Sequence, residues 1–255
     1  MSMRPRTLKW AGAWMLWVLG GPLARGADIV IADLSATRYP GNEDGYSGSL
    51  TLQQSGENGG VLLGATKMTV PAGSLVVGNL DGYLIESKQV TLSAGMSIGD
   101  ATTDARNISL YKARLAADVQ INPSWSIRAA DQYVDFDVIH GQIMSLGSEY
   151  RVNPSWGVKC AAGYSLGGTV ADRYGEIALH WYGPEYVFAG IVVGRTGYDL
   201  VDLGQVDLVR RLRQAYLGTS IPLRRATLNI SADDLALDGQ SRQTLHIGVT
   251  WPIKS

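Results

Sequence analysis

The sequence has little of several residue types that would narrow its function. Its 255 residues include one cysteine, three histidines and two phenylalanines, and the formal net charge is −1 at pH 7. A single cysteine excludes an internal disulfide and a thiolate zinc cluster. Three scattered histidines have no metal-ligand spacing, so no metal site or other cofactor is expected. A net charge near zero gives no reason to expect a nucleic-acid partner.

The residues that are abundant favour β-structure. Apolar residues make up 45% of the chain and charged residues 18%, which excludes a disordered protein. The 31 glycines exceed the usual share of about 7%, and 12 tyrosines and 7 tryptophans supply most of the aromatic content. This composition is typical of strands and turns rather than of a helical bundle.

The first 26 residues resemble a targeting signal. Three basic residues precede an apolar run over 10–19, and the small residues Ala24 and Gly26 follow it. This order predicts a secretory signal peptide over 1–26. The rival interpretation is an N-terminal membrane anchor, but the run is short for a hydrocarbon core of about 30 Å. We therefore expect a single mature domain over 27–255.

Long apolar runs are missing from the rest of the chain. No later segment has 18 consecutive apolar residues, so no transmembrane helix is expected. Instead, apolar and polar residues alternate over 89–98, 108–121, 156–166, 225–232 and 244–251. A period of two places the apolar residues on one face of a sheet. Segments of about 10 residues match tilted strands that cross a bilayer.

The turns recur at regular intervals. Asn122-Pro123-Ser124-Trp125 returns as Asn153-Pro154-Ser155-Trp156, and Gly183-Pro184 and Pro222 follow. Proline marks strand ends, so we expect these turns at one end of the structure. The longer polar stretches 99–106, 167–172, 198–205 and 237–241 are expected at the other end.

This frame predicts an all-β fold, an antiparallel up-and-down transmembrane β-barrel of 12–14 strands. Both chain ends would lie on the periplasmic, short-turn side. Twelve strands stay open because the first strand and the one from 74 alternate poorly. The fourteen expected strands begin near residues 28, 46, 60, 74, 89, 107, 124, 139, 155, 173, 185, 206, 224 and 241.

The C-terminus has the spacing of an outer-membrane assembly signal. His246, Gly248, Trp251 and Ile253 fit a polar-x-Gly-x-x-apolar-x-apolar pattern, although Pro252 and the last two residues depart from it. Tyrosines and tryptophans beside the turns are placed as an aromatic girdle would be. We expect a Gram-negative outer-membrane protein whose partners are outer-membrane lipid, lipopolysaccharide and the barrel-assembly machinery. The alternative fold is a soluble periplasmic β-sandwich or lipocalin-like barrel.

Residues from about 107 to 255 resemble the YaiO-type outer-membrane β-barrel family. The resemblance rests on 133–137, on 156–158, on 174–176 and on the hairpin 181–186. It implies an outer-membrane location and an association with exopolysaccharide or surface-polymer systems. It brings no catalytic residues.

Charged residues opposite the apolar faces are expected to line the lumen. One interpretation is a salt-bridged plug, and the other is a cation-lined path for an anionic solute or a polysaccharide. Basic residues outnumber acidic ones in this set, which favours anionic cargo. Arg210 is expected to face lipid and to pair with lipopolysaccharide phosphates. The expected lumen-lining residues are Lys112, Arg114, Asp118, Arg128, Glu149, Arg151, Lys159, Glu176, His180, Arg211, Arg213 and Arg225.

One cluster is a candidate for catalysis. His140 follows Asp135 and Asp137 closely, but position 142 is Gln and no activated serine lies nearby. Cys160 falls among outward apolar residues and is expected to face lipid. We therefore expect no catalytic residues and a non-enzymatic role in passive permeation or exopolysaccharide export. The alternatives are a plugged structural or adhesive barrel and a lipid-modifying enzyme at the rim.

Overall fold

The computed structural model describes residues 28–71, 73–103, 107–136, 139–168, 173–196, 210–238 and 240–253. They form fourteen strands, as the turn pattern predicted, and twelve is excluded. The strands are β1 (Ile29–Tyr39), β2 (Glu43–Gly56), β3 (Gly59–Val70), β4 (Gly73–Ile85), β5 (Val90–Thr103), β6 (Asn107–Asn122), β7 (Trp125–Phe136), β8 (Ile139–Asn153), β9 (Trp156–Gly168), β10 (Arg173–Tyr182), β11 (Tyr186–Thr196), β12 (Arg210–Leu223), β13 (Ala226–Leu237) and β14 (Gln240–Pro252).

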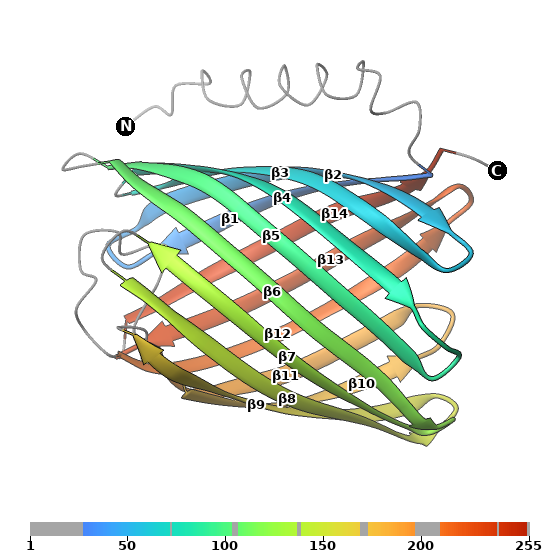
Figure 1. The fold of residues 1–255 in the computed structure, drawn as a ribbon. Helices are drawn as coiled ribbons and strands as arrows, with labels where there is room; N and C mark the ends of the chain where they lie inside the picture. Colours follow the sequence, from blue (N-terminus) through green and yellow to red (C-terminus); the bar gives the residue numbers. More distant parts are fainter. Residues whose placement is uncertain are drawn as a thin grey trace.

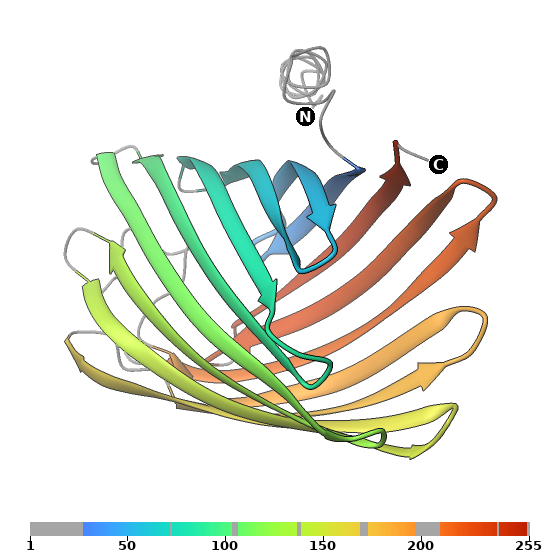
Figure 2. The same cartoon turned by 45° about the vertical axis from the view of Figure 1, so that its right-hand side comes forward.

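The strands close into one antiparallel barrel. Each strand pairs with its neighbours in the chain, and β1 pairs with β14 to complete the ring. Figure 1 shows the barrel from the side, with the start of β1 and the end of β14 at the same end, and Figure 2 shows the curved wall from a second direction. We call this end the terminal rim and the opposite end the distal rim. Closure leaves no unpaired strand edge, which a bilayer requires.

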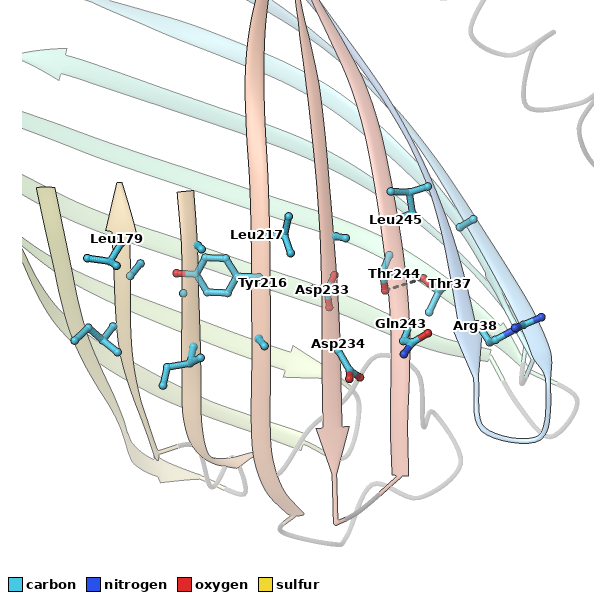
Figure 3. A pocket seen from close by; sticks show the side chains of 18 of the residues that line it. Thr37, Arg38, Leu179, Tyr216, Leu217, Asp233, Asp234, Gln243, Thr244 and Leu245 are labelled. Carbon is cyan, nitrogen blue, oxygen red and sulfur yellow. Dashed lines mark hydrogen bonds between the residues drawn. The ribbon is translucent and has the colours of Figure 1, made fainter. Parts of the chain in front are cut away.

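The seam between the first and last strands is also joined by side chains. Ten residues of β1, from Ile29 to Arg38, face residues of β14 in an unbroken register. Thr37 Oγ1 donates a hydrogen bond to Thr244 Oγ1 at 3.1 Å (Figure 3). The first and last strands are therefore held together by backbone pairing and by a side-chain hydrogen bond.

The two side-chain faces of the sheet follow the predicted alternation through the middle of each strand. On β6, Leu115 and Ala117 belong to the outer face, while Lys112 and Asp118 belong to the inner face. Large apolar residues of the outer face are widely exposed, as Leu115 is at 64%. An apolar surface of this kind is suited to lipid and not to water.

The repeated asparagine-proline turns are built alike. Asn122 Oδ1 accepts a hydrogen bond from the Ser124 backbone N–H, and Asn153 Oδ1 accepts one from Ser155, both at 2.9 Å. An asparagine that bonds the backbone two residues on is a turn initiator. Both turns lie at the terminal rim, as predicted. Pro222, in contrast, lies inside β12, and the turn follows it at 224–225.

Inner-face glycines accommodate aromatic side chains from other strands. A Cβ on Gly163 would lie 2.2 Å from the Tyr174 ring, and a Cβ on Gly218 would lie 2.4 Å from Phe188. The ring covers the space that the missing side chain leaves, and such glycines help a sheet to curve. This use explains part of the high glycine content.

Strands extend into three of the four polar stretches that were expected to be loops at the distal rim. β5 extends to Thr103, β9 extends to Gly168, and β13 and β14 enter 237–241. Residues 1–27, which hold the expected signal peptide, and 197–209 lie outside the described residues. Within the part of the chain that the structure describes, no helix is long and apolar enough to cross a membrane.

Candidate functional site: the barrel lumen

The inner face carries a group of charged residues that begins at Lys112, opposite Val134, and extends to the terminal rim. We call this group the charged belt, and it occupies β6–β10. Nine of the expected lumen residues lie on this face. They are Lys112, Arg114, Asp118, Arg128, Glu149, Arg151, Lys159, Glu176 and His180.

The charged belt is exposed to solvent on the β6–β7 wall. Arg128 Nη1 and Asp118 Oδ2 form a salt bridge of 3.1 Å across the two strands, yet the two side chains are 45% and 38% exposed. Residues packed into a solid plug would be buried. Solvent therefore reaches the inner face at this level.

The belt is more tightly bonded on the β8–β10 wall. Lys159 Nζ donates to Glu176 Oε1 at 3.1 Å. Tyr182 donates its hydroxyl to Glu149, and the Tyr182 ring is covered by the Arg151 guanidinium, whose Cζ lies 4.5 Å from the ring centroid. Charged and aromatic groups thus hold one another in place along this wall.

A row of four aromatic side chains extends from the β8–β10 wall to β12, and it consists of Tyr182, Tyr186, Phe188 and Tyr216. Ring centroids are 5.6 Å apart for Tyr182 and Tyr186, 5.7 Å for Tyr186 and Phe188, and 6.1 Å for Phe188 and Tyr216. Tyr216 donates its hydroxyl to Glu176, which joins the far end of the row to the charged belt. We call these four residues the aromatic row. His180 Nδ1 lies 3.2 Å from the Tyr186 hydroxyl.

The inner face changes character towards the distal rim. There it carries a packed apolar cluster that the sequence pattern did not predict, and Val134 within it is fully buried at 0% exposure. We call this cluster the distal collar, and it lies on β4–β8. Its members are Leu75, Val77, Ala101, Ile108, Leu110, Val134, Phe136 and Ile143.

Three residues expected in the lumen are elsewhere. The register pairs Arg211 with Arg195 and Arg213 with Val193, which places Arg211 and Arg213 on the outer face near the distal rim. Arg225 lies in the exposed turn after β12. The expectation was wrong because it assigned every charged strand residue to the lumen, whereas an outer face that leaves the hydrocarbon region also tolerates charge. The side chain of Arg210 is outside the described structure.

On the part of the inner face that the structure describes, the expected surplus of basic residues is also absent. Asp33, Asp81 and Asp233 belong to the inner face of β1, β4 and β13, and the expected lumen set did not include them. Asp33 accepts a hydrogen bond from Ser49 Oγ at 3.3 Å, and Asp233 lies 3.3 Å from His246 Nε2. Acidic and basic groups are therefore mixed on the described inner face. The alternation in the sequence could have predicted that these three carboxylates face the lumen, because each of them is flanked by outer-face residues.

Three of the four assembly-signal residues lie in the C-terminal part of β14. His246 and Gly248 belong to the inner face and Trp251 to the outer face, while Ile253 follows the strand. A Cβ on Gly248 would lie 1.9 Å from the Asp33 carboxylate. This glycine therefore makes room for a neighbour on β1. Recognition by the assembly machinery stays a prediction.

The candidate catalytic cluster lies on the outer face. Asp135 and His140 are paired across β7 and β8, and Asp137 lies outside the described residues. Gln142 donates to Asp131 at 2.6 Å, so the residue two positions after His140 is engaged in an amide–carboxylate bond. Cys160 is exposed on the outer face, as expected. The described residues hold no group of three metal-ligating side chains.

A hollow of about 1,100 Å³ lies along β10–β14, β1 and β2. Figure 3 shows part of its lining, including Leu179, Leu217 and Leu245. Most of its lining residues have the register of the outer face. It is therefore distinct from the charged belt.

Comparisons with known proteins identify similar barrels. The CymD monoaromatic hydrocarbon channel matches with a TM-score of 0.64 and 9% identity, over 91% of this chain and 90% of that one. The toluene transporter TodX of P. putida matches with a TM-score of 0.59 and 9% identity, over 92% and 93%. A bacterial polysaccharide outer-membrane secretin matches with a TM-score of 0.50 and 9% identity, over 90% and 99%.

The chain has the fold of outer-membrane β-barrels. At this level of identity the likeness shows the fold alone. No family model and no curated protein matches the sequence, so membership of the YaiO-type family stays a prediction.

Proposed function

We propose that this protein is an outer-membrane barrel that lets small solutes permeate passively through its lumen and that it has no enzymatic activity. The observation that carries the proposal is the exposure of Arg128 and Asp118, at 45% and 38%, inside a closed barrel. Ions and water move through a pore only where its wall stays hydrated. The mixed charges of the wall favour small polar or zwitterionic solutes over the anionic cargo suggested by sequence.

The proposed location follows from the outer surface. Leucine, isoleucine and valine side chains of the outer face are exposed on strands all around the barrel. Trp125, Trp156 and Trp251 stand at the terminal rim, where an interfacial aromatic girdle belongs. We propose that the terminal rim faces the periplasm after removal of the signal peptide and that the distal rim faces the exterior.

Export of exopolysaccharide is a second candidate, and the aromatic row favours it. Sugars present flat C–H faces to aromatic rings and hydroxyl groups to carboxylates. Tyr186 and Tyr216 supply rings, and Glu176 supplies a carboxylate beside them. The row therefore has the two kinds of group that a sugar chain would contact.

Reconstitution tests both candidates. The purified barrel is placed in planar bilayers and in liposomes, with heat-dependent gel mobility as the check of folding. We expect stepwise conductance and swelling by small sugars and amino acids. A folded barrel that shows neither is a plug, and the permeation proposal then fails. The polysaccharide candidate requires in addition that oligosaccharides block the current, and that Tyr186→Ala with Tyr216→Ala abolishes the block.

A further inference from the structure

Three arginines form a lateral row on the outer face at the distal rim. Arg173 on β10 pairs in register with Arg195 on β11, and Arg195 pairs with Arg211 on β12. All three side chains are exposed. We call these residues the arginine row. Arg213, also exposed, lies two residues further along β12.

Such a row is costly without an anion. Like charges directly opposite one another on neighbouring strands are destabilising. Among the described residues, no salt bridge joins any of these arginine side chains to a carboxylate. Arg38 at the same rim differs, because its neighbour in register is Asp44. In the row, Arg211 has a carboxylate close by, because its backbone N–H donates to Asp238 Oδ1 at 2.9 Å. Arg173 and Arg195 have no carboxylate among their neighbours in register, so the row keeps an excess of positive charge that an external anion would offset.

The surface beside the row indicates the kind of anion. Towards the middle of the barrel, the outer face of the same strands continues with Ile177, Val193 and Leu217, all of them exposed. A ligand that covers both parts has an anionic head and acyl chains. Adjacent strands lie about 4.8 Å apart, so the row spans about 10 Å. Guanidinium groups bind phosphate oxygens in a bidentate manner.

We propose that the arginine row binds the phosphate groups of a phosphorylated glycolipid of the outer leaflet, of the lipid A type. This inference goes beyond permeation and rests on the proposed orientation, in which the distal rim faces the exterior. The sequence had suggested Arg210 for this role. The register assigns it to Arg211 and to its two lateral neighbours.

Binding of purified bisphosphorylated lipid A to the full-length barrel in detergent tests the proposal. The variant is Arg195→Gln with Arg211→Gln. The matched control, Arg38→Gln with Lys67→Gln, removes two exposed cations from the same face near the same rim, on β1 and β3. We expect the row variant to lose about tenfold in affinity per arginine and the control to stay within about twofold.

Two further probes separate the alternatives. Monophosphorylated lipid A should bind more weakly than the bisphosphorylated form, and phosphatidylglycerol vesicles should not distinguish the two variants. Equal losses in both variants, or equal discrimination with phosphatidylglycerol, overturn the proposal in favour of general attraction to anions. Should the double variant fold poorly, Arg195→Lys serves as the second variant. It keeps the positive charge but not the planar guanidinium, and we expect its affinity for lipid A to lie between those of the parent protein and the double variant.

The same samples distinguish this proposal from the proposed function. A barrel that conducts but binds lipid A equally in all variants overturns only the lipid site. A protein without a heat-dependent gel shift overturns the membrane barrel and the lipid site together.

Discussion

The distal collar and the charged belt share strands and a face, yet they are opposite environments. On β6, Ile108 and Leu110 are buried at 3% and 6% exposure, whereas Asp118 on the same face is 38% exposed. The change happens within a few residues of one strand. The barrel wall is therefore equally regular in both regions, and only the inward side chains decide whether the lumen is dry or wet.

This difference assigns separate roles to the two regions. Packed apolar groups such as Val134 and Phe136 exclude water and stiffen the distal part of the wall. Ionised groups that remain hydrated contribute little to stability but set which solutes can pass. We therefore expect substitutions in the collar to change stability and access, and substitutions in the belt to change selectivity.

The largest effect is expected from a charge placed in the collar. Leu75→Asp would bury a carboxylate among apolar side chains, because the neighbours of Leu75 in register are Met68 and Ala101, and this costs about 3–5 kcal/mol. The control is Gln132→Asp on the inner face of β7, where Arg114 is the neighbour in register. Urea unfolding followed by gel mobility should show a loss of stability for Leu75→Asp only. Equal stability of the two variants would mean that the collar is as wet as the belt.

The second largest effect on stability is expected from a truncated side chain in the collar. Leu110→Ala removes buried apolar volume and is expected to cost about 2–5 kcal/mol while it widens the distal opening. Leu115→Ala on the same strand faces outward with 64% exposure and should leave both properties nearly unchanged. Single-channel conductance is the deciding measurement. If Leu110→Ala conducts like the parent protein, the collar does not restrict passage.

The distal collar could not be predicted from the sequence pattern, whereas the strands could. Strand number and strand starts could be predicted because turns rest on local chemistry, as the bonds of Asn122 and Asn153 show. Along β7, however, apolar residues face outward at Ile127 and inward at Val134 and Phe136. The period of two is unchanged while the apolar side switches. Periodicity alone does not say which side is the lumen.

The same switch explains the misplaced arginines. Near the distal rim the outer face carries Arg211 and Arg213 while the inner face carries Leu235 and Leu237 of the next strand. A rule that places every charge inside holds only where hydrocarbon covers the outside. The depth at which hydrocarbon ends is a property of the assembled barrel, and no single segment of sequence encodes it.

Selectivity should respond to charge in the belt and not on the outer face. Arg114 is exposed on the inner face, so Arg114→Glu is expected to shift the reversal potential in a salt gradient towards cation preference. Arg213→Glu makes the same change in net charge on the outer face. A shift of equal size in both variants would show that overall charge, and not the lumen wall, sets the preference.

The smallest effect is expected from the salt bridge that marks the belt as wet. Arg128 and Asp118 are 3.1 Å apart but 45% and 38% exposed, so water and salt screen their attraction. A double-mutant cycle with Arg128→Ala and Asp118→Ala should give a coupling energy of about 0–1 kcal/mol, and raised ionic strength should reduce it. A coupling energy above about 2 kcal/mol that resists salt would be that of a desolvated pair. The belt would then be dry like the collar, and the barrel would be a plug along its whole length.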